Sequence, residues 1–241
     1  MQINNAVAFV TGANRGIGRS LVEHLLDRGA RRVYAAARDT RPLATFVARD
    51  SKRIVTLRLD ITHDEDVQAA VRAASDVNLL INNAGVANFG SFLDGEFAPI
   101  EHDMAINFFG TLRMIRAFAP ILQRNKDAAL VNLLTIVSLA SIPMLGGYCA
   151  SKAAAYSMTQ ALRAELTPRG VCVHGVFPGP VDTDMIRAVE MPKTSSADVA
   201  WAILDGIEAG EEDIRPDSMS QQAYAGWLAD PKALEREFAL T

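Results

Sequence analysis

Cysteine is nearly absent from this sequence, and long apolar runs, clusters of basic residues and internal repeats are missing. The two cysteines, Cys149 and Cys172, have neither metal-ligand spacing nor the pattern of a disulfide framework. We therefore expect packing residues in a reduced, cytoplasmic protein, and no metal site. The run Ala6–Val10 is too short for a signal peptide or a membrane span, so we expect neither secretion nor a membrane partner.

Charge and composition narrow the class of protein further. The formal net charge is −4, and basic residues form only short pairs such as Arg31-Arg32, which argues against a nucleic-acid partner. With 241 residues, 49% of them hydrophobic and 22% charged, the chain has the balance of a globular protein. Its length suffices for one large core, so we predict one domain over residues 1–241.

The order of hydrophobic patterns indicates the fold class. Short, almost continuously apolar runs, typical of strands buried on both faces of a parallel sheet, alternate with helical patterns. The runs are Ala6–Val10, Val33–Ala37, Ile54–Leu59, Asn78–Asn82, Leu130–Leu134, Val171–Phe177 and the short Asp213–Pro216. The helical patterns are Ser20–Arg28, Val67–Ala74, Ile106–Leu122, Ala150–Leu166 and Ala197–Ala209, with a possible helix after Ser218. We predict an α/β doubly wound, Rossmann-type parallel sheet of about seven strands with helices on both faces.

One break in this alternation is rich in proline and glycine. Residues 178–196 contain Pro178, Gly179, Pro180, Pro192 and two adjacent serines. The segment is too short for a domain boundary, and we interpret its later part, near residues 184–197, as a lid or specificity loop.

The first apolar run leads directly into a glycine-bearing turn. Residues 11–18 read TGANRGIG, and a helical pattern follows. Glycines at such a turn let the backbone approach a pyrophosphate, whose charge then faces the N-terminus of a helix. The spacing Gly-x-x-x-Gly-x-Gly differs from that of other dinucleotide folds, and such a turn can also be purely structural. Its place after the first strand predicts a nucleotide site.

The end of the second strand favours NADP(H) over NAD(H). NAD-binding folds place an acidic residue here for the ribose 2′-hydroxyl, whereas this chain has Ala37 at that position. Arg38 follows at once, and Arg15 lies in the glycine turn. Two guanidinium groups suit a 2′-phosphate, although each is also a typical solvated loop residue. Asp39 is a nearby carboxylate that leaves NAD(H) as an alternative.

Four further segments, with the glycine turn, show a resemblance to the short-chain dehydrogenase/reductase family. They are Asn82-Asn83-Ala84-Gly85 at a strand end, Asn107 in a long helix, Tyr148-x-x-x-Lys152 at the start of a helix, and Pro178-Gly179-Pro180-Val181-Asp182-Thr183 after the sixth strand. Tyr-x-x-x-Lys alone is common by chance; all five elements in this order are specific. The resemblance covers about residues 5–185.

The resemblance implies a set of cofactor-binding residues that runs from the phosphates and adenosine to the nicotinamide. They are Gly12, Asn14, Arg15, Gly16, Ile17, Gly18, Arg38, Asp60, Ile61, Asn83, Ala84, Gly85, Tyr148, Lys152, Pro178, Gly179, Val181 and Thr183. In this assignment Asp60 accepts a hydrogen bond from the adenine amine. Asp60 could instead cap the helix that begins near residues 62–65, and residues 82–85 could be an ordinary strand-end turn.

Tyr148 and Lys152 have the spacing and chemistry of an acid–base pair. Residues four apart on a helix lie on one face, so both side chains can enter one cleft. A nearby ammonium favours the phenolate, and a tuned phenol can give a proton to a carbonyl oxygen or take one from an alcohol. The resemblance adds that Lys152 binds the nicotinamide ribose and that Asn107 holds a water in a proton relay. Asn107 could also be a core amide.

The position of the substrate-orienting hydroxyl departs from the family. A serine is usual thirteen residues before the tyrosine, and here that position is Thr135. Threonine keeps the hydroxyl but adds a methyl group and a stiffer χ1. Ser138 is the competing candidate. We therefore predict a catalytic set of Tyr148, Lys152, Thr135 and Asn107.

These residues predict a cofactor-dependent oxidoreductase. Hydride would pass between NADP(H) and a carbonyl or alcohol substrate, and the apolar residues Met185, Ile186, Val189 and Met191 favour a hydrophobic ketone or aldehyde, unless they only seat the lid. Two alternatives are a non-catalytic NADP(H)-binding or redox-sensing protein and a β-ketoacyl-carrier reductase, for which scattered basic residues (Arg113, Arg116, Arg124, Lys126) hint at a docking surface. By resemblance, the helices 106–122 and 150–166 would pair in a homodimer or homotetramer.

Overall fold

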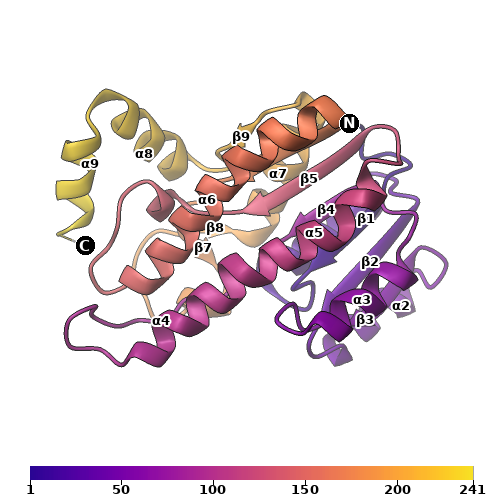
Figure 1. Cartoon of the computed structure of the whole chain (residues 1–241), viewed down its shortest axis with the longest axis horizontal. Coiled ribbons are helices and arrows are strands. Elements are labelled where there is room, and N and C mark those ends of the chain that lie inside the picture. Colours follow the sequence, from indigo (N-terminus) through magenta and orange to yellow (C-terminus); the bar gives the residue numbers. More distant parts are fainter. Residues whose placement is uncertain (241) are drawn as a thin grey trace.

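A seven-stranded parallel sheet forms the centre of the computed structural model, which describes residues 1–240 (Figure 1). The strand order is β3-β2-β1-β4-β5-β6-β9, so the chain reverses its direction of winding between β1 and β4. This confirms the predicted fold class. The strands are β1 Val7–Thr11, β2 Arg32–Ala37, β3 Ile54–Arg58, β4 Leu79–Asn82, β5 Ala128–Leu133, β6 Val171–Val176 and β9 Asp213–Ile214.

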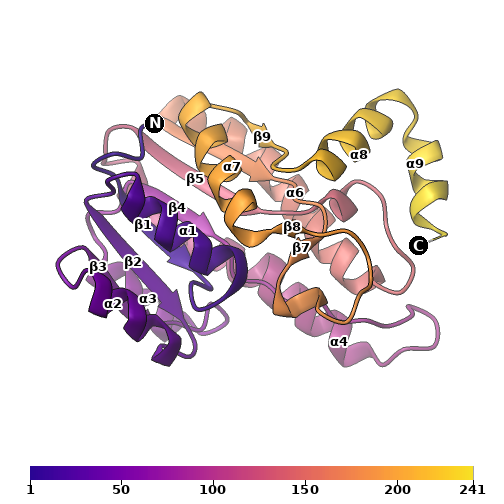
Figure 2. The same ribbon diagram turned by 180° about the vertical axis from the view of Figure 1, so that it is seen from behind.

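Helices cover both faces of this sheet. Figure 1 shows α3, α5 and α6 in front of the sheet, and Figure 2 shows α1, α2 and α7 on the opposite side. The helices are α1 Gly16–Asp27, α2 Ala44–Arg49, α3 Asp64–Ala73, α4 Phe97–Asp103, α5 Thr111–Leu122, α6 Gly146–Leu166, α7 Ser196–Ala209, α8 Ser218–Ala229 and α9 Pro231–Phe238. The six-residue α2 was not predicted, because one short turn leaves no periodic pattern.

Alternating side chains of the strands fill the two halves of the core. In β1, Ala8 and Val10 pack in the cluster beneath α1 and α7, whereas Val7 and Phe9 pack in the cluster beneath α3 and α5. A strand buried on both sides has no polar face, which explains its continuous apolar run. The apolar patterns therefore located the strands, to within one or two residues at most ends.

The helix predicted over Ile106–Leu122 begins nine residues earlier and changes its winding. It consists of α4, a π-helical segment Met104–Gly110 and α5. The prediction missed α4 because its one buried side chain is the charged Asp103, so no apolar stripe marks it. The stretch Phe97–Leu122 is long and apolar enough to cross a membrane by length and composition alone, but half of it is buried in the protein, as in a core helix of a globular fold.

The region beyond residue 180 is more ordered than predicted. The loop predicted near residues 184–197 contains a 3-10 turn, Asp184–Ile186, and a short ladder between β7 (Val181–Asp182) and β8 (Thr194–Ser195). The tail forms two helices, α8 and α9, rather than one, and the predicted strand Asp213–Pro216 is limited to Asp213–Ile214. Asp217 caps α8 and also accepts a hydrogen bond from the backbone N–H of Gly179, 2.9 Å away, which ties the tail to the end of β6.

A chain of buried polar side chains attaches α6 to the sheet. The Asn82 amide donates to Asn132 on the neighbouring strand, and Asn132 donates to the Thr159 hydroxyl in α6, both at 3.0 Å. All three side chains are buried. These two hydrogen bonds join β4, β5 and α6 inside the core and hold α6 against the two strands. The remaining acceptor, Asn82 Oδ1, is buried without a hydrogen-bond partner among the described residues.

His174 on β6 is a buried histidine in a neutral form. It is 2% exposed, its Nδ1 lies 2.6 Å from the Glu211 carbonyl oxygen, and its Nε2 is buried without a hydrogen-bond partner among the described residues. The proton must therefore sit on Nδ1, which donates to the carbonyl. Burial lowers the pKa of His174 from its ordinary value of 6.5.

This environment predicts a loss of stability in acid. Below pH 6.5 the unfolded chain binds a proton at His174 that the folded protein binds less readily, so the free energy of unfolding falls as the pH decreases through and below that value. The substitution His174→Asn keeps an N–H donor for Glu211 but cannot titrate. Denaturant unfolding at several pH values between 7.5 and 5 should show a shallower decline for this variant. Equal slopes for both proteins would contradict the prediction.

Candidate active site

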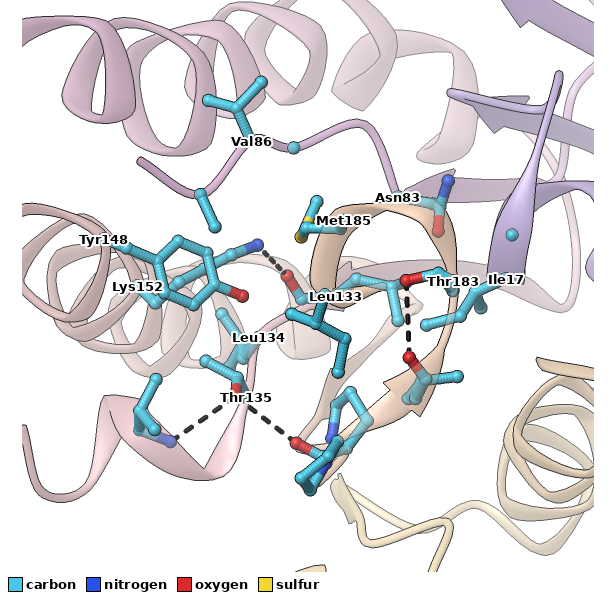
Figure 3. Close-up of a pocket in the computed structure, with 18 of the residues that line it drawn as sticks. Ile17, Asn83, Val86, Leu133, Leu134, Thr135, Tyr148, Lys152, Thr183 and Met185 are labelled. Carbon is cyan, nitrogen blue, oxygen red and sulfur yellow. Dashed lines mark hydrogen bonds between the residues drawn. The ribbon is translucent and has the colours of Figure 1, made fainter. Parts of the chain in front are cut away.

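A large cavity of about 940 Å³ lies at the carboxyl ends of β1, β4, β5 and β6. All the predicted cofactor-binding residues except Gly18 line it, as do Tyr148, Lys152 and Thr135. Figure 3 shows Tyr148, Lys152 and Thr135 on one side of this space and Ile17, Asn83 and Thr183 on the other. In a doubly wound sheet this edge, next to the reversal of winding, is where ligands bind.

The glycine turn between β1 and α1 needs glycine at three positions. Gly12 and Gly16 have φ of 65° and 51°, in the left-handed region that other residues avoid. A Cβ at Gly18 would lie 2.3 Å from the Gly12 carbonyl oxygen and 2.4 Å from Nδ2 of Asn83. That Asn83 amide donates to the carbonyl oxygens of Thr11 and Gly12, at 2.9 and 3.1 Å. Gly18 and the Asn83 side chain thus pack against the backbone of the turn and fix its conformation.

The N-terminus of α1 fits an anionic group. Its N-cap residue, Arg15, makes no side-chain capping hydrogen bond, and the first turn contains no acidic residue. Gly16 and Ile17, the first residues of the helix, line the cavity without a capping side chain, and the helix dipole favours a negative charge there. The residues present fit the pyrophosphate of a dinucleotide cofactor.

The adenosine side of the cavity carries both predicted arginines. Arg38 is exposed, and Arg15 pairs with Asp184 at 3.8 Å. Asp39, the carboxylate that left NAD(H) open, is held by Arg41 through side-chain hydrogen bonds of 2.9 and 2.8 Å. These hydrogen bonds lower the pKa of Asp39 to about 2, and they leave fewer of its acceptors for a ribose.

Asp60 does not cap the helix that follows it. The cap residue of α3 is His63, whereas Asp60 accepts hydrogen bonds from the backbone N–H and the hydroxyl of Thr62, at 2.9 and 2.6 Å. The alternative interpretation of Asp60 as a helix cap is therefore wrong. Asp60 and Ile61 line the cavity beside Arg38.

Lys152 has the most unusual environment of the site. The side chain is 6% exposed, and its Nζ donates to the Leu133 carbonyl oxygen at 2.6 Å, a contact drawn in Figure 3. Nζ lies 5.9 Å from the centre of the Tyr148 ring. Burial lowers the pKa of Lys152 to about 8, and the charge of Asp103 opposes this effect.

Thr135, rather than Ser138, occupies the cavity beside Tyr148. Thr135 begins a 3-10 turn after β5, and its hydroxyl donates to the Pro178 carbonyl oxygen at 3.3 Å. Burial raises the pKa of the Tyr148 phenol, and a hydrogen bond with the Thr135 side chain acts in the opposite direction. Ser138 is one turn further on, does not line the cavity, and has a buried hydroxyl without a partner among residues 1–240.

Asn107 lies behind Lys152 in the π-helical segment. Its Oδ1 accepts from the Val86 N–H at 3.0 Å, and its Nδ2 donates to the Val86 carbonyl and the Ser151 hydroxyl, both at 2.9 Å. A Cβ at Gly85 would lie 3.0 Å from Asn107 Oδ1 and 3.6 Å from Lys152 Nζ, so only glycine lets the three segments meet this closely. The Asn107 side chain connects the turn after β4 with α6 through these hydrogen bonds, and it does not line the cavity.

The turn after β6 closes the cavity next to the glycine turn. Pro178 accepts the Thr135 hydroxyl through its carbonyl oxygen, and the methyl group of Thr183 would lie 3.0 Å from a Cβ at Gly16. Pro178, Gly179, Val181 and Thr183 all line the cavity.

One wall of the cavity was missed by the sequence analysis. Side chains of α8 and α9, and of the loop before α6, line the end remote from the glycine turn. They are Ile142, Met144, Leu145, Met219, Gln222, Ala223, Gly226, Leu234, Glu237 and Phe238. No local motif marks these residues, since only the folding of the tail over the sheet brings them to the site. The predicted lid residues Met185, Ile186, Val189 and Met191 line the cavity as well.

Comparisons with known proteins agree with this geometry. The family model for short chain dehydrogenase matches residues 6–193. A short chain dehydrogenase from Burkholderia cenocepacia, solved with NADP, is 41% identical with a TM-score of 0.93, and the match covers 99% of both chains. One from Burkholderia phymatum, solved with NAD, is 25% identical with a TM-score of 0.87, covering 97% of this chain and 96% of that one. An oxidoreductase of Staphylococcus saprophyticus is 33% identical, over 77% of this chain and 82% of the relative.

The fold and the site thus define an oxidoreductase that binds a nicotinamide dinucleotide and acts on CH–OH groups. The chain belongs to the short-chain dehydrogenase/reductase family.

The packing behind the glycine turn predicts the effect of one added methyl group. In Gly18→Ala the new Cβ would overlap the Gly12 carbonyl and the Asn83 amide, so the turn must shift and cofactor affinity should fall at least tenfold, about 1.4 kcal/mol. Fluorescence titration with NADPH measures this loss. Gly90→Ala is the matched control, because a Cβ there meets nothing within 4 Å. Unchanged affinity in the Gly18 variant would contradict the prediction.

Proposed function

We propose that this protein is an NADP(H)-dependent carbonyl reductase that acts reversibly on a hydrophobic ketone or aldehyde. The observation that carries the proposal is the meeting of Tyr148, Lys152 and Thr135 at one point of a cavity whose remote wall is largely apolar. Family membership makes the reaction an oxidoreduction; the direction, the cofactor form and the substrate are the proposed part.

The three side chains divide the acid–base work. Tyr148 donates its proton to the carbonyl oxygen as that oxygen gains negative charge, and in the reverse direction accepts it from the alcohol. Thr135 lies within reach of the same oxygen and orients it. Lys152, a cation next to the phenol, stabilises the phenolate that remains. The nicotinamide cofactor, when bound, supplies or accepts the hydride.

In this scheme Asn107 supports the position of Lys152. Its side-chain hydrogen bonds to Val86 and Ser151 hold the turn after β4 against the helix that carries Lys152. We therefore keep Asn107 in the catalytic set as the residue that supports Lys152, with the water relay implied by the family as its further role.

The proposed cofactor-binding residues follow the length of the cavity. Gly12, Asn14, Gly16 and Ile17 would hold the pyrophosphate, shaped from behind by Gly18. Asp60 and Ile61 would hold the adenine, Asn83, Ala84 and Gly85 the riboses, and Pro178, Gly179, Val181 and Thr183 the nicotinamide. NADP(H) is proposed because the basic groups of this end, Arg15 and Arg38, suit a phosphate, while the neighbouring Asp39 is bound to Arg41.

A hydrophobic substrate is supported by the wall of the cavity beyond Tyr148. The lid contributes Met185, Ile186, Val189 and Met191, and α8 and α9 contribute Met219, Ala223, Leu234 and Phe238. Unbranched methionines adapt to ligands of different shape.

The two alternatives have less support. A non-catalytic NADP(H)-binding protein rests on Thr135 in place of serine, but the hydroxyl still reaches Tyr148. A β-ketoacyl-carrier reductase needs a basic docking surface, whereas Arg113 is paired with Asp64 and donates to the Ile61 carbonyl oxygen at 3.1 Å.

A homodimer or homotetramer, expected from the family, is also part of the proposal. The large apolar side chains of Phe97 and Phe109, on the long helical stretch α4–α5, are 72% and 53% exposed. Burial against a second chain would remove this apolar surface from water.

The role of Tyr148 predicts the outcome of removing one oxygen atom. Tyr148→Phe should lower kcat at least about 10²-fold, because it removes the proposed proton donor to the carbonyl oxygen, and should leave the Kd for NADPH nearly unchanged. NADPH oxidation with a mixed panel of ketones and aldehydes measures kcat. Tyr156→Phe, two turns further along the same helix and outside the cavity lining, is the control. Undiminished turnover in Tyr148→Phe would refute the mechanism, and a wild-type protein inactive on the whole panel would favour the non-catalytic alternative.

The proposed contact of Arg38 with a 2′-phosphate predicts a change in cofactor preference. Arg38→Ala should raise the KM for NADPH about tenfold or more and change the KM for NADH little, since charge-assisted hydrogen bonds contribute about 1.5–3 kcal/mol. Initial rates with both cofactors test this expectation. Arg31→Ala, an exposed arginine outside the cavity, should change neither KM. A parallel rise in both KM values would count against a 2′-phosphate contact.

A further inference from the structure

One buried carboxyl group beside the active centre lies outside the set of residues assigned to the proposed reaction. Asp103, the last residue of α4, is 1% exposed. Its Oδ1 accepts a hydrogen bond from Asn88 at 2.8 Å, and its Oδ2 is buried without a hydrogen-bond partner among the described residues. Burying such a group costs free energy unless its surroundings compensate. The group that compensates should therefore lie where Oδ2 points.

That neighbour is the first turn of α6. A Cβ at Gly147 would lie 3.3 Å from Asp103 Oδ2 and 3.2 Å from the Ile100 Cα atom, and a Cβ at Gly146 would lie 2.4 Å from the ring of Phe92. The two glycines before Tyr148 thus allow α4 and the loop before it to approach the backbone of α6 directly. Any side chain at these positions would separate the two helices.

The first turn of α6 has no negative group of its own. Its N-cap residue, Leu145, makes no side-chain capping hydrogen bond, and the first turn contains no acidic residue. A helix N-terminus carries partial positive charge and unpaired N–H groups, and a carboxylate placed there is stabilising. In this protein the carboxylate comes from another helix, and Tyr148 is the third residue of the helix it faces.

The charges around Asp103 connect it with Lys152. Asp103 is the charged side chain that acts on Lys152, and it raises the pKa of that ammonium against the larger effect of burial. It acts in the same direction on the pKa values of Tyr148 and Cys149, also in α6. The other titratable groups facing it are His102 on its own helix and Glu96, which lines the same small cavity from the preceding loop.

We propose that Asp103 is a positioning residue for the reaction: its carboxylate faces the first turn of α6, holds Tyr148 in place through that turn, and balances the buried charge of Lys152. Asn88 orients the carboxylate by binding Oδ1. Asp103 lies four residues before Asn107, so the same helical stretch supports α6 at two points. The Asp103 carboxylate faces the first turn of α6, and the Asn107 side chain donates to the hydroxyl of Ser151 in the second turn. The role in turnover rests on the function proposed above.

The substitution Asp103→Asn removes the charge while keeping the size of the side chain. Alcohol oxidation with NADP requires the phenolate, so its rate falls on the acid side of the pH profile. On the acid side Lys152 is still charged, and without the negative charge of Asp103 the phenolate forms more readily, so we expect this acid limb to move down by about one pH unit. On the plateau kcat should fall several-fold, because Lys152 then loses its proton at lower pH and no longer stabilises the phenolate. The Kd for NADPH, measured by fluorescence, should stay within about twofold of the wild-type value.

Two further variants separate this role from a general loss of stability. Glu101→Gln removes an exposed charge from the same helix and should leave the profile unchanged. Gly147→Ala inserts a methyl group between Asp103 and α6 and should also lower kcat; in the double variant with Asp103→Asn the two losses should not multiply, because both break one contact. An acid limb that stays in place in Asp103→Asn, or losses that multiply fully, would overturn the proposal.

A measurement that needs no substrate keeps the proposal independent of the proposed function. The chain has five lysines, and Lys152 is the buried one, so its side-chain carbon signal can be followed by NMR in lysine-labelled protein and assigned with Lys152→Met. The wild-type signal should titrate with a midpoint of about 8. Asp103→Asn should lower the midpoint, and Glu101→Gln should not. Equal midpoints would overturn the proposal even if no carbonyl substrate is found, whereas a lowered midpoint would support it in either case.

Discussion

The burial of the Lys152 ammonium is the constraint around which the centre of this protein is arranged. A cation at 6% exposure cannot rely on water, so nearby elements must supply its partners. The Leu133 carbonyl at the end of β5 accepts its hydrogen bond at 2.6 Å, and the absence of a side chain at Gly85 lets the turn after β4 lie against it. Each partner belongs to a different element, and the network through Asn132 and Thr159 keeps those elements in register.

The same constraint separates the cavity into two parts of opposite character. The glycine turn, the uncapped N-terminus of α1 and the two arginines make the end near β1 and β2 suitable for phosphates. The end beyond Tyr148 is built of methionine, leucine and phenylalanine side chains from the lid and from α8 and α9. The reacting groups stand at the boundary, where a proton donor can be partly shielded from water yet remain within reach of both halves. This division is the physical basis of the proposed reaction.

The sequence predicted the parts of the site that are encoded locally. The glycine turn, Ala37 with Arg38, and Tyr148 with Lys152 are contiguous patterns, and each follows a strand or begins a helix that the hydrophobic pattern also locates. Strand-buried apolar runs likewise predicted the sheet. The wall formed by Met219, Leu234 and Phe238 could not be predicted, because tertiary contacts bring the tail to the site. These are the hydrogen bond from Gly179 to Asp217 and the packing of α8 and α9 against the segment after β5. Asp103 was not predicted either, because a single buried charged residue in a short helix leaves no periodic pattern in the sequence.

Thr135 shows why the choice between neighbouring hydroxyls needed the structure. Thr135 and Ser138 are three residues apart, and a strand continuing through both would place them on opposite faces of the sheet. The chain instead turns at Thr135, two residues after the end of β5. The Thr135 hydroxyl accepts a hydrogen bond from the Val137 N–H at 3.4 Å and donates one to the Pro178 carbonyl oxygen. Two backbone partners and a β-branched side chain leave this hydroxyl little rotational freedom. A serine at the same position could turn away from the substrate, so threonine trades adaptability for a fixed orientation, and its methyl group narrows the cavity next to Tyr148. Under the proposed function, threonine in place of the family's serine would restrict which carbonyl compounds fit while keeping the hydroxyl.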